Sequence, residues 1–407
     1  MEKLMTNEII KKTEKAMVNV YNRNEIIFEY GNGMYLYDVN GKKYLDFSSG
    51  IGVCALGYND EYFNECLKKQ IDSLLHTSNL YYNVPLADAV NNVAKATGMD
   101  KVFFTNSGAE AVEGALKLAR RYAYNKYGNN KNKIISMDNS FHGRTFGALS
   151  VTGNEKYQEP FKPLVGNVEF AGYNDVEALK KVVDEETCAI ILETIQGEGG
   201  IMPCTKEFIE TVRELCTEYD IAMICDEIQC GMGRSGYMFA YQEYGILPDI
   251  VVCAKAIGNG VPVGAFAAVD KFASAMVPGD HGTTYGGNPF VTSAVNAVFK
   301  LFDDKKILDN VKNISVYLEK RLNELVDKYD CVVERRGKGL MQGIVINHSV
   351  KNIIDKSLEK GLVVVSARGD VIRFLPPLIL EKKHVDEMIV ILEDVLTNEL
   401  QYSNNLI

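Results

Sequence analysis

The sequence contains Val251-Val252-Cys253-Ala254-Lys255-Ala256-Ile257-Gly258-Asn259-Gly260, an apolar run that ends in a lysine and a turn rich in glycine. Earlier in the chain, Ile224-Cys225-Asp226-Glu227-Ile228-Gln229 places an aspartate at the same point of another short apolar run. Continuous apolar runs of this length are typical of parallel strands that are buried on both faces. We therefore expect Lys255 and Asp226 at the carboxyl ends of two strands of a parallel sheet.

A lysine amine and a carboxylate placed in this way suit pyridoxal 5′-phosphate as a cofactor. The amine of Lys255 would condense with the aldehyde of the cofactor, and the carboxylate of Asp226 would pair with its ring nitrogen and keep it protonated. Strands that end in Asp or Lys are common, so this pair alone indicates little. The motifs around it make the prediction specific.

Helical stretches that alternate with short apolar runs between about residues 60 and 290 predict an α/β fold. This alternation is typical of βαβ units around a mostly parallel sheet covered by helices. After residue 290, a long helical region and further strands indicate a smaller α+β domain that shares the first residues of the chain. We expect an N-terminal segment of the small domain at 1–58, a large cofactor-binding domain at 59–290 and a C-terminal small domain at 291–407. The strands predicted in the large domain are 102–104, 134–137, 189–192, 222–225, 250–253 and 265–268.

The charge and composition of the 407 residues argue against nucleic acid and membranes as partners. A formal net charge of −10 disfavours binding to nucleic acid or to an anionic membrane surface. No apolar stretch is long enough to span a bilayer, and the first residues lack the apolar core of a signal peptide. Nine cysteines without a C-x-x-C pair suggest reduced thiols, so we expect a cytoplasmic protein. Histidines at ligand spacing are missing beside Cys225, Cys230 and Cys253, so we expect no metal there.

A junction between a predicted strand and a predicted helix, Thr105-Asn106-Ser107-Gly108-Ala109-Glu110, indicates a phosphate site. Ser107 and Glu110 have the spacing of a helix capping box, and Gly108 permits close approach to the backbone. The start of a helix offers unpaired N–H groups and the positive end of its dipole, which suit a phosphate. An ordinary capped helix fits the same pattern. A second loop, 283–289, combines hydroxyls with glycines and is either another phosphate contact or a surface turn.

Two arginines, Arg144 and Arg373, are candidates for binding substrate carboxylates. Arg144 follows closely after Phe141, whose ring is suited to stacking on a planar cofactor. Arg373 lies between apolar neighbours in a predicted strand, where an unpaired charge is costly, so we expect it to meet a carboxylate. Glu193 and Glu198 follow another predicted strand, and Glu198 is the candidate partner of Arg373. A permanent structural ion pair would fit this pattern as well.

Taken together, the segments around these residues resemble class III pyridoxal-phosphate-dependent aminotransferases, and among them most closely the acetylornithine aminotransferases. They occur in the order of that family and span most of the chain, so the combined signal is highly specific. His142, inside one of them, is expected to pack against its neighbours or to bond the backbone. The matching segments are Asn106-Ser107-Gly108-Ala109-Glu110-Ala111, Phe141-His142-Gly143-Arg144, Gln196-Gly197-Glu198-Gly199-Gly200, Asp226-Glu227-Ile228-Gln229, Ala254-Lys255, Gly258-Asn259-Gly260 and Thr284-Tyr285-Gly286-Gly287-Asn288-Pro289.

The resemblance implies a pyridoxal-phosphate-dependent transferase of fold type I, with a seven-stranded sheet, that forms a homodimer with shared active sites. It implies that Lys255 and Asp226 are catalytic, that Gln229 contacts the ring hydroxyl of the cofactor and that Phe141 stacks on the ring. Thr284 would reach the phosphate of the cofactor in the partner subunit. Within one subunit the phosphate would be held by Ser107, Gly108 and Ala109.

The resemblance also implies how two substrates share one site. Arg144 would bind the distal carboxylate of a substrate, and Arg373 would bind the α-carboxylate of glutamate or 2-oxoglutarate. Glu198 would cover Arg373 while the other amino donor is bound, because that donor brings no carboxylate to it. Glu193 is placed with these substrate-binding residues.

The amino donor that the resemblance favours is N2-acetyl-L-ornithine, which would give N-acetyl-L-glutamate 5-semialdehyde in arginine biosynthesis. Ornithine aminotransferases place a tyrosine where Ile51 stands, and Ile51 offers no hydrogen bond to a free α-amino group. Gly199-Gly200 also resembles the acetylornithine enzymes. Ornithine, 4-aminobutyrate and N-succinyl-diaminopimelate remain alternative donors. Glutamate-1-semialdehyde aminomutase and a non-catalytic cofactor-binding protein are further alternatives, which the pairing of Arg373 with Glu198 and the intact Lys255 disfavour.

Overall fold

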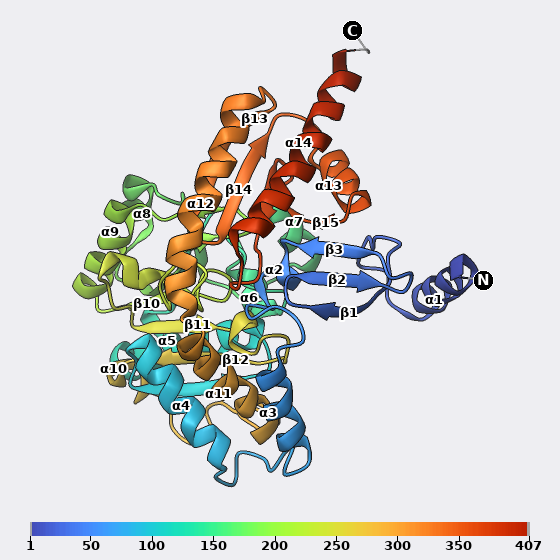
Figure 1. Ribbon diagram of the computed structural model, residues 1–407. Helices are drawn as coiled ribbons and strands as arrows, with labels where there is room; N and C mark the ends of the chain where they lie inside the picture. The colour runs from blue at the N-terminus through green and yellow to red at the C-terminus, as the bar shows by residue number, and fades with distance from the viewer. Residues whose placement is uncertain (1, 405–407) are drawn as a thin grey trace.

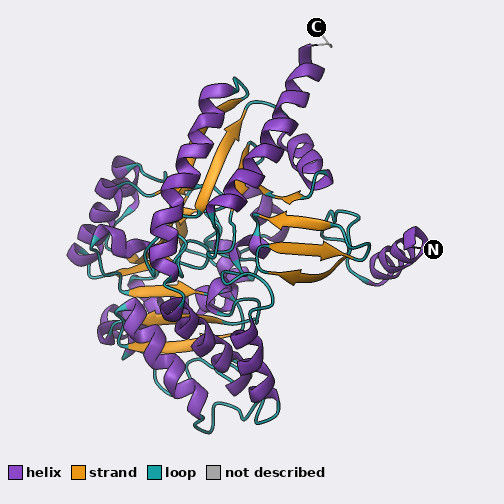
Figure 2. Ribbon diagram, viewed as in Figure 1, coloured by secondary structure: helices purple, strands orange, loops and turns teal. Residues whose placement is uncertain are grey.

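The computed structural model describes residues 2–404, and its largest element is a seven-stranded sheet (Figures 1 and 2). Strand β12 runs antiparallel to both of its neighbours, and all other neighbouring strands in this sheet are parallel. The expected mostly parallel, seven-stranded sheet is therefore confirmed. In spatial order the strands are β4 (Lys101–Thr105), β12 (Gly264–Ala268), β11 (Ile250–Cys253), β10 (Ala222–Asp226), β7 (Thr187–Glu193), β5 (Lys133–Met137) and β6 (Val168–Ala171).

Helices cover both faces of this sheet, because alternate residues of each strand enter two separate apolar cores. In β10, Ile224 belongs to the core under one face, whereas Met223 and Cys225 belong to the core under the other. This arrangement explains why the strands are apolar without interruption. The first core is closed by α5 (Gly108–Tyr127), and the second by α4 (Val84–Thr97), α9 (Lys206–Glu218) and α11 (Pro289–Asp304).

Two smaller four-stranded sheets are built from the two ends of the chain. The first contains the antiparallel strands β1 (Phe28–Asn32), β2 (Tyr35–Asp38) and β3 (Lys43–Asp46), and β15 (Leu362–Val363) extends it in parallel to β3. The N-terminal strands thus share a sheet with the C-terminal part of the chain. The domain boundaries at residues 58 and 290 stay predictions. The second sheet has the order β13 (Val332–Lys338), β14 (Met341–Ile346), β17 (Val371–Phe374) and β16 (Val365–Ala367).

The remaining helices surround these sheets, and α1 (Glu2–Ala16) stands apart from the rest of the chain at the right of Figure 1. No helix within residues 2–404 is both long enough and apolar enough to cross a membrane. The long helices of the C-terminal part are α12 (Ile307–Lys328), α13 (Val350–Glu359) and α14 (Lys382–Asn404). The others are α2 (Ser49–Gly52), α3 (Glu61–Ile71), α6 (Phe146–Ser150), α7 (Glu155–Gln158), α8 (Val176–Val182) and α10 (Asp270–Ala273), and the short strands β8 (Ile195–Gln196) and β9 (Met202–Pro203) pair with each other.

The carboxyl ends of the parallel strands meet at one edge of the large sheet, and this edge carries the site. The loops that follow β4, β5, β7, β10 and β11 all contribute residues to one cavity of about 430 Å³. Ligands of open α/β sheets bind outside the carboxyl ends of the strands. The topology therefore gathers five loops from distant parts of the sequence around a single space.

Candidate active site

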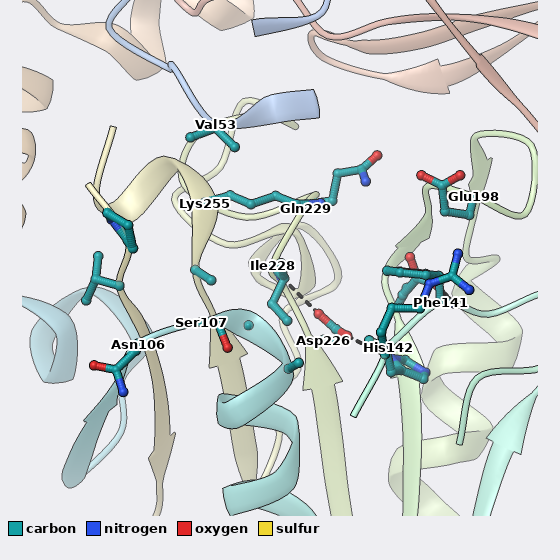
Figure 3. Close-up of a pocket in the computed structure, with 18 of the residues that line it drawn as sticks. Val53, Asn106, Ser107, Phe141, His142, Glu198, Asp226, Ile228, Gln229 and Lys255 are labelled. Carbon is teal, nitrogen blue, oxygen red and sulfur yellow. Dashed lines mark hydrogen bonds and ion pairs between the residues drawn. The ribbon is translucent and has the colours of Figure 1, made fainter. Parts of the chain in front are cut away.

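Lys255 and Asp226 line the same cavity, as their places at two strand ends predict (Figure 3). Asp226 is the last residue of β10, and Lys255 follows β11 and opens a short 3-10 turn, Lys255–Ile257. The backbone of Lys255 has a φ of 48°, in the left-handed region that residues other than glycine rarely adopt. Strain of this kind costs on the order of 1–3 kcal/mol and gathers at functional sites.

The carboxylate of Asp226 is buried and held from two sides. Its Oδ1 accepts a hydrogen bond of 3.0 Å from the backbone N–H of Ile228, and its Oδ2 lies 2.6 Å from Nδ1 of His142. The side chain of His142 is fully buried, and its Nε2 has no hydrogen-bond partner among the described residues. The prediction for His142 was incomplete, because its ring bonds Asp226 rather than only packing or bonding the backbone. Sequence reasoning missed this contact because 84 positions separate the two residues.

The amine of Lys255 lies in surroundings that disfavour its charged form. Burial is the main cause of its lowered pKa, and the positive charge of Arg373 lowers the pKa further. The carboxylates of Asp226, Glu198 and Glu193 oppose this effect in part. A lysine with a lowered pKa presents more neutral amine near neutral pH, which is the form that attacks an aldehyde.

The start of α5 is the place where the sequence predicts a phosphate site, and phosphate binding there stays a prediction. The side chain of Ser107 caps the helix by accepting a hydrogen bond of 3.2 Å from the backbone N–H of Glu110. The reciprocal contact differs from a capping box, because Glu110 accepts from the backbone and side-chain nitrogens of Asn106, one residue earlier than expected. The N–H groups of Gly108 and Ala109 therefore lie in the first turn, where the helix supplies no acceptor.

Gly108 supports the fit of a phosphate at this helix start. A Cβ at this position would lie 2.8 Å from Cδ1 of Ile228, so the turn has room for backbone alone. Ser107, Gly108 and Ala109 all line the cavity that holds Lys255. An anion-binding helix start, an amine and a buried carboxylate around one cavity are the groups that pyridoxal phosphate requires, and the residues present fit that cofactor.

Phe141 and Glu193 also line this cavity, and Glu193 fixes two loops at once. Its Oε1 accepts a 3.0 Å hydrogen bond from the backbone N–H of Phe141, and its Oε2 accepts a 3.0 Å hydrogen bond from the backbone N–H of Gly197. Burial raises the pKa of Glu193 to about 7, and the charge of Asp226 adds to this effect, which His142 opposes. These contacts indicate a residue that positions loops, and a contact with substrate stays a prediction.

Arg144 lines the cavity, and its positive charge has no carboxylate partner among the described residues. Its guanidinium carbon is 3.8 Å from the centre of the Tyr157 ring and 5.4 Å from that of Phe141. It makes no hydrogen bond or ion pair with another described residue. Cation–π stacking of this kind holds the planar group in place while its N–H edges stay free. Tyr157 was missed by sequence reasoning, because no motif singles it out.

Arg373 lies in β17 behind Glu198 and Gln229, and it is not part of the cavity wall. Its Nη1 donates to Oε1 of Glu198 at 2.6 Å and to Oε1 of Gln229 at 3.1 Å, and its Nη2 donates to the backbone oxygen of Ser366 at 3.1 Å. The predicted ion pair of Arg373 and Glu198 is therefore present. Its two ends differ, because 3% of the Arg373 side chain and 32% of the Glu198 side chain are exposed.

Thr284 is the one predicted cofactor-binding residue that lies away from Lys255. It is exposed and lines a separate cavity of about 680 Å³ together with Thr105, Asn106 and Tyr285. Within the described chain there is also no group of three or more His, Cys, Asp or Glu side chains arranged to hold a metal ion. No disulfide bond joins any of the nine cysteines in the described chain.

A strand-end lysine beside a buried carboxylate, with a helix start facing the same cavity, defines a pyridoxal-phosphate-dependent enzyme of fold type I. Comparison with known proteins gives its family, since residues 17–396 match the model of aminotransferase class III. The chain belongs to the class III aminotransferases, and its cofactor is pyridoxal phosphate.

Relatives with known names resemble nearly the whole chain. An acetylornithine aminotransferase of Methanocaldococcus jannaschii is 44% identical over 388 residues, which are 94% of this chain and 96% of that protein. One of Clostridium acetobutylicum is 46% identical over 383 residues, which are 94% of this chain and 99% of that protein. The structure of the ornithine aminotransferase of Toxoplasma gondii, with PLP partly occupying its active site, superposes with a TM-score of 0.93 at 28% identity. It covers 97% of this chain and 94% of its own.

Proposed function

We propose that the enzyme transfers the terminal amino group of N2-acetyl-L-ornithine to 2-oxoglutarate. The products are N-acetyl-L-glutamate 5-semialdehyde and L-glutamate, and the reaction belongs to arginine biosynthesis. The observation that carries this proposal is the 44–46% identity to two acetylornithine aminotransferases over 94% of the chain. The site adds a physical reason, because it has two arginines of different availability: Arg144 lines the cavity of Lys255, and the buried Arg373 is paired with Glu198, which also lines it.

Bound pyridoxal phosphate supplies an aldehyde that carries the amino group between the two substrates, and a protonated ring that accepts the electron pair released at the reacting carbon. Lys255 would hold the cofactor, and its freed Nζ would move the proton from the carbon that bears the amine. Asp226, which is bonded to His142, would balance the positive charge of the ring nitrogen. Phe141 would stack on the ring, and Gln229 would contact the ring hydroxyl.

The two carboxylate-binding arginines act in turn. Arg144 takes the carboxylate of acetylornithine, because its guanidinium edges have no other partner in the described chain. That donor brings no carboxylate to Arg373, so Glu198 stays paired with it. Glutamate or 2-oxoglutarate brings an α-carboxylate, and Glu198, whose side chain is partly exposed, swings away and leaves Arg373 to this substrate.

We also propose that two copies of the chain form a homodimer with shared active sites in the cytoplasm. Thr284 supports this proposal, because it lines a cavity whose lining residues do not include Lys255. In a dimer it would reach the phosphate of the cofactor in the partner subunit. Apolar side chains that a single chain leaves exposed also support a subunit contact, among them Leu80, Tyr82 and Val84.

Ornithine is the second candidate donor, because the superposed Toxoplasma gondii enzyme is named an ornithine aminotransferase. Ile51, which the sequence offered against ornithine, is 42% exposed and does not line the cavity of the described chain. The identity of the curated relatives therefore supports acetylornithine more strongly than Ile51 does.

The test compares acetylornithine, ornithine and 4-aminobutyrate as donors to 2-oxoglutarate with the purified enzyme. We expect glutamate release from each productive pair and the highest kcat/KM with acetylornithine. A preference for another donor would contradict the proposed substrate. Isomerisation of glutamate 1-semialdehyde without glutamate release would contradict the reaction itself.

A further inference from the structure

A further cavity, of about 480 Å³, shares Arg144 with the site. We call it the side chamber, and its walls are formed by Val20, Tyr21, Arg144, Phe146, Leu149 and Phe161. Arg144 is the residue that belongs to the walls of both the side chamber and the Lys255 cavity. A carboxylate bound to Arg144 therefore lies where the two spaces meet.

The side chamber is lined mainly by apolar and aromatic groups that a small molecule would find accessible. Val20 is 68% exposed and Phe146 is 62% exposed, although both are apolar. None of the described residues that line the chamber is acidic. Such walls gain free energy by covering an apolar group, and they offer nothing to a positive charge.

The position of Arg144 decides which part of a donor enters this space. Tyr157 stacks against its guanidinium at 3.8 Å, so the N–H edges are held in a fixed plane and remain open to a carboxylate. In an N2-acylated ornithine, only the α-carbon and the α-nitrogen separate the carboxylate from the acyl carbon. The terminal amine reaches toward Lys255, and the acyl group must then lie beside Arg144.

We propose that the side chamber binds the acyl group on the α-nitrogen of the amino donor. This inference rests on the proposed function and adds the part of the site that distinguishes acylated donors. A free α-ammonium would lie next to the positive charge of Arg144 with no carboxylate in the chamber wall to balance it. An acyl group carries no such charge, and each methylene that it buries improves binding by about fourfold.

Filling the side chamber tests the proposal. We expect Val20→Trp to lower kcat/KM for N2-acetylornithine by about tenfold and to lower it more for N2-succinylornithine, since a longer acyl group needs more of the chamber. The half-reaction with glutamate should stay within about twofold of the wild type, because glutamate has no acyl group. The matched control is Val316→Trp in α12, an equally exposed valine at 69% that is outside both cavities. It should leave both half-reactions unchanged.

Three results would overturn the proposal. Equal losses in the acetylornithine and glutamate half-reactions would place the effect of Val20→Trp in the shared chemistry. Kinetics that match those of Val316→Trp would show that the acyl group does not bind in the side chamber. A Val20→Trp enzyme with an altered sedimentation mass would show that the chamber is covered by a second subunit. The proposed function fails separately, when the wild-type enzyme itself does not use N2-acetylornithine.

Discussion

The charged groups at the floor of the Lys255 cavity are held differently from those at its rim. On the floor, Asp226 and His142 are both buried, and the carboxylate is bonded from two sides. At the rim, Glu198 keeps 32% of its side chain exposed, and it pairs with the buried Arg373 behind it. A fully buried pair is costly to separate, whereas an exposed partner exchanges its bond for water at little cost. We therefore expect Asp226 and His142 on the floor to stay in place, and Glu198 at the rim to separate from Arg373.

Two glutamates on the same connection show the contrast within a few residues. Glu193, at the end of β7, has both carboxylate oxygens bonded to backbone N–H groups. Glu198, in the loop after β8, has its bond to Arg373 instead. Glu193 holds two loops in place, and Glu198 pairs with Arg373. A glutamate can therefore either fix loops or act as a releasable partner. Its burial and the group that donates hydrogen bonds to it determine which role it has.

The largest effect is expected on the floor. Asp226→Asn keeps the shape of the side chain but removes its charge, so the ring nitrogen loses the group that balances its proton. We expect both half-reactions to slow by about 10²-fold or more. Single-turnover absorbance changes with acetylornithine and with glutamate measure each half separately, and Lys255→Ala gives the reference with no turnover. A slower half-reaction with only one of the two substrates would contradict a role of Asp226 in both half-reactions.

A selective effect is expected at the rim. Glu198→Ala leaves Arg373 without its carboxylate, and Nε of Arg373 already has no hydrogen-bond partner among residues 2–404. We expect the acetylornithine half-reaction to slow by about fivefold, since an ion pair with one partly exposed partner contributes about 1 kcal/mol. The glutamate half-reaction should change less, because its α-carboxylate replaces Glu198.

The control for the rim is Glu243→Ala. Glu243 pairs with Lys338 at 2.6 Å and is exposed to a similar extent, but it does not line the cavity. It should leave both half-reactions unchanged. Equal slowing of the two half-reactions by Glu198→Ala would show that Glu198 is a permanent structural partner rather than a gate.

Much of the fold could be predicted because its signals are local. The apolar runs that end at Asp226 and before Lys255 predicted two strands, and the topology of parallel sheets then brought both residues to one edge. The cap at Ser107 was predicted from spacing within one turn. β6 was missed because it is a short edge strand with the exposed Glu169 in its middle, which weakens the apolar signal.

Contacts between distant residues could not be predicted in the same way. His142 meets Asp226 and Tyr157 meets Arg144 only because loops after different elements converge. Neither residue carries a pattern that names its partner. The pair of Arg373 and Glu198 was an exception, because a charge inside an apolar strand demands an opposite charge nearby.

The smallest effect concerns the pH dependence of stability, and it is expected at Glu193. The pKa of Glu193 is raised from 4.5 to about 7, so the folded protein keeps a proton there that the unfolded chain has released. Its contribution to the free energy of unfolding is complete below pH 4.5 and is lost as the pH rises through about 7. Between these values the loss is at most ~1.4 kcal/mol per pH unit.

Glu193→Gln should remove this loss. The amide keeps one acceptor for the two backbone N–H groups, so stability falls at every pH by about 1–3 kcal/mol, but its dependence on pH becomes flatter. The wild type, measured beside it, gives the reference slope. Urea unfolding of cofactor-free protein between about pH 5 and pH 8 measures both slopes. Parallel curves for the wild type and Glu193→Gln would mean that the buried carboxyl is already ionised in the folded floor, held so by its two backbone donors.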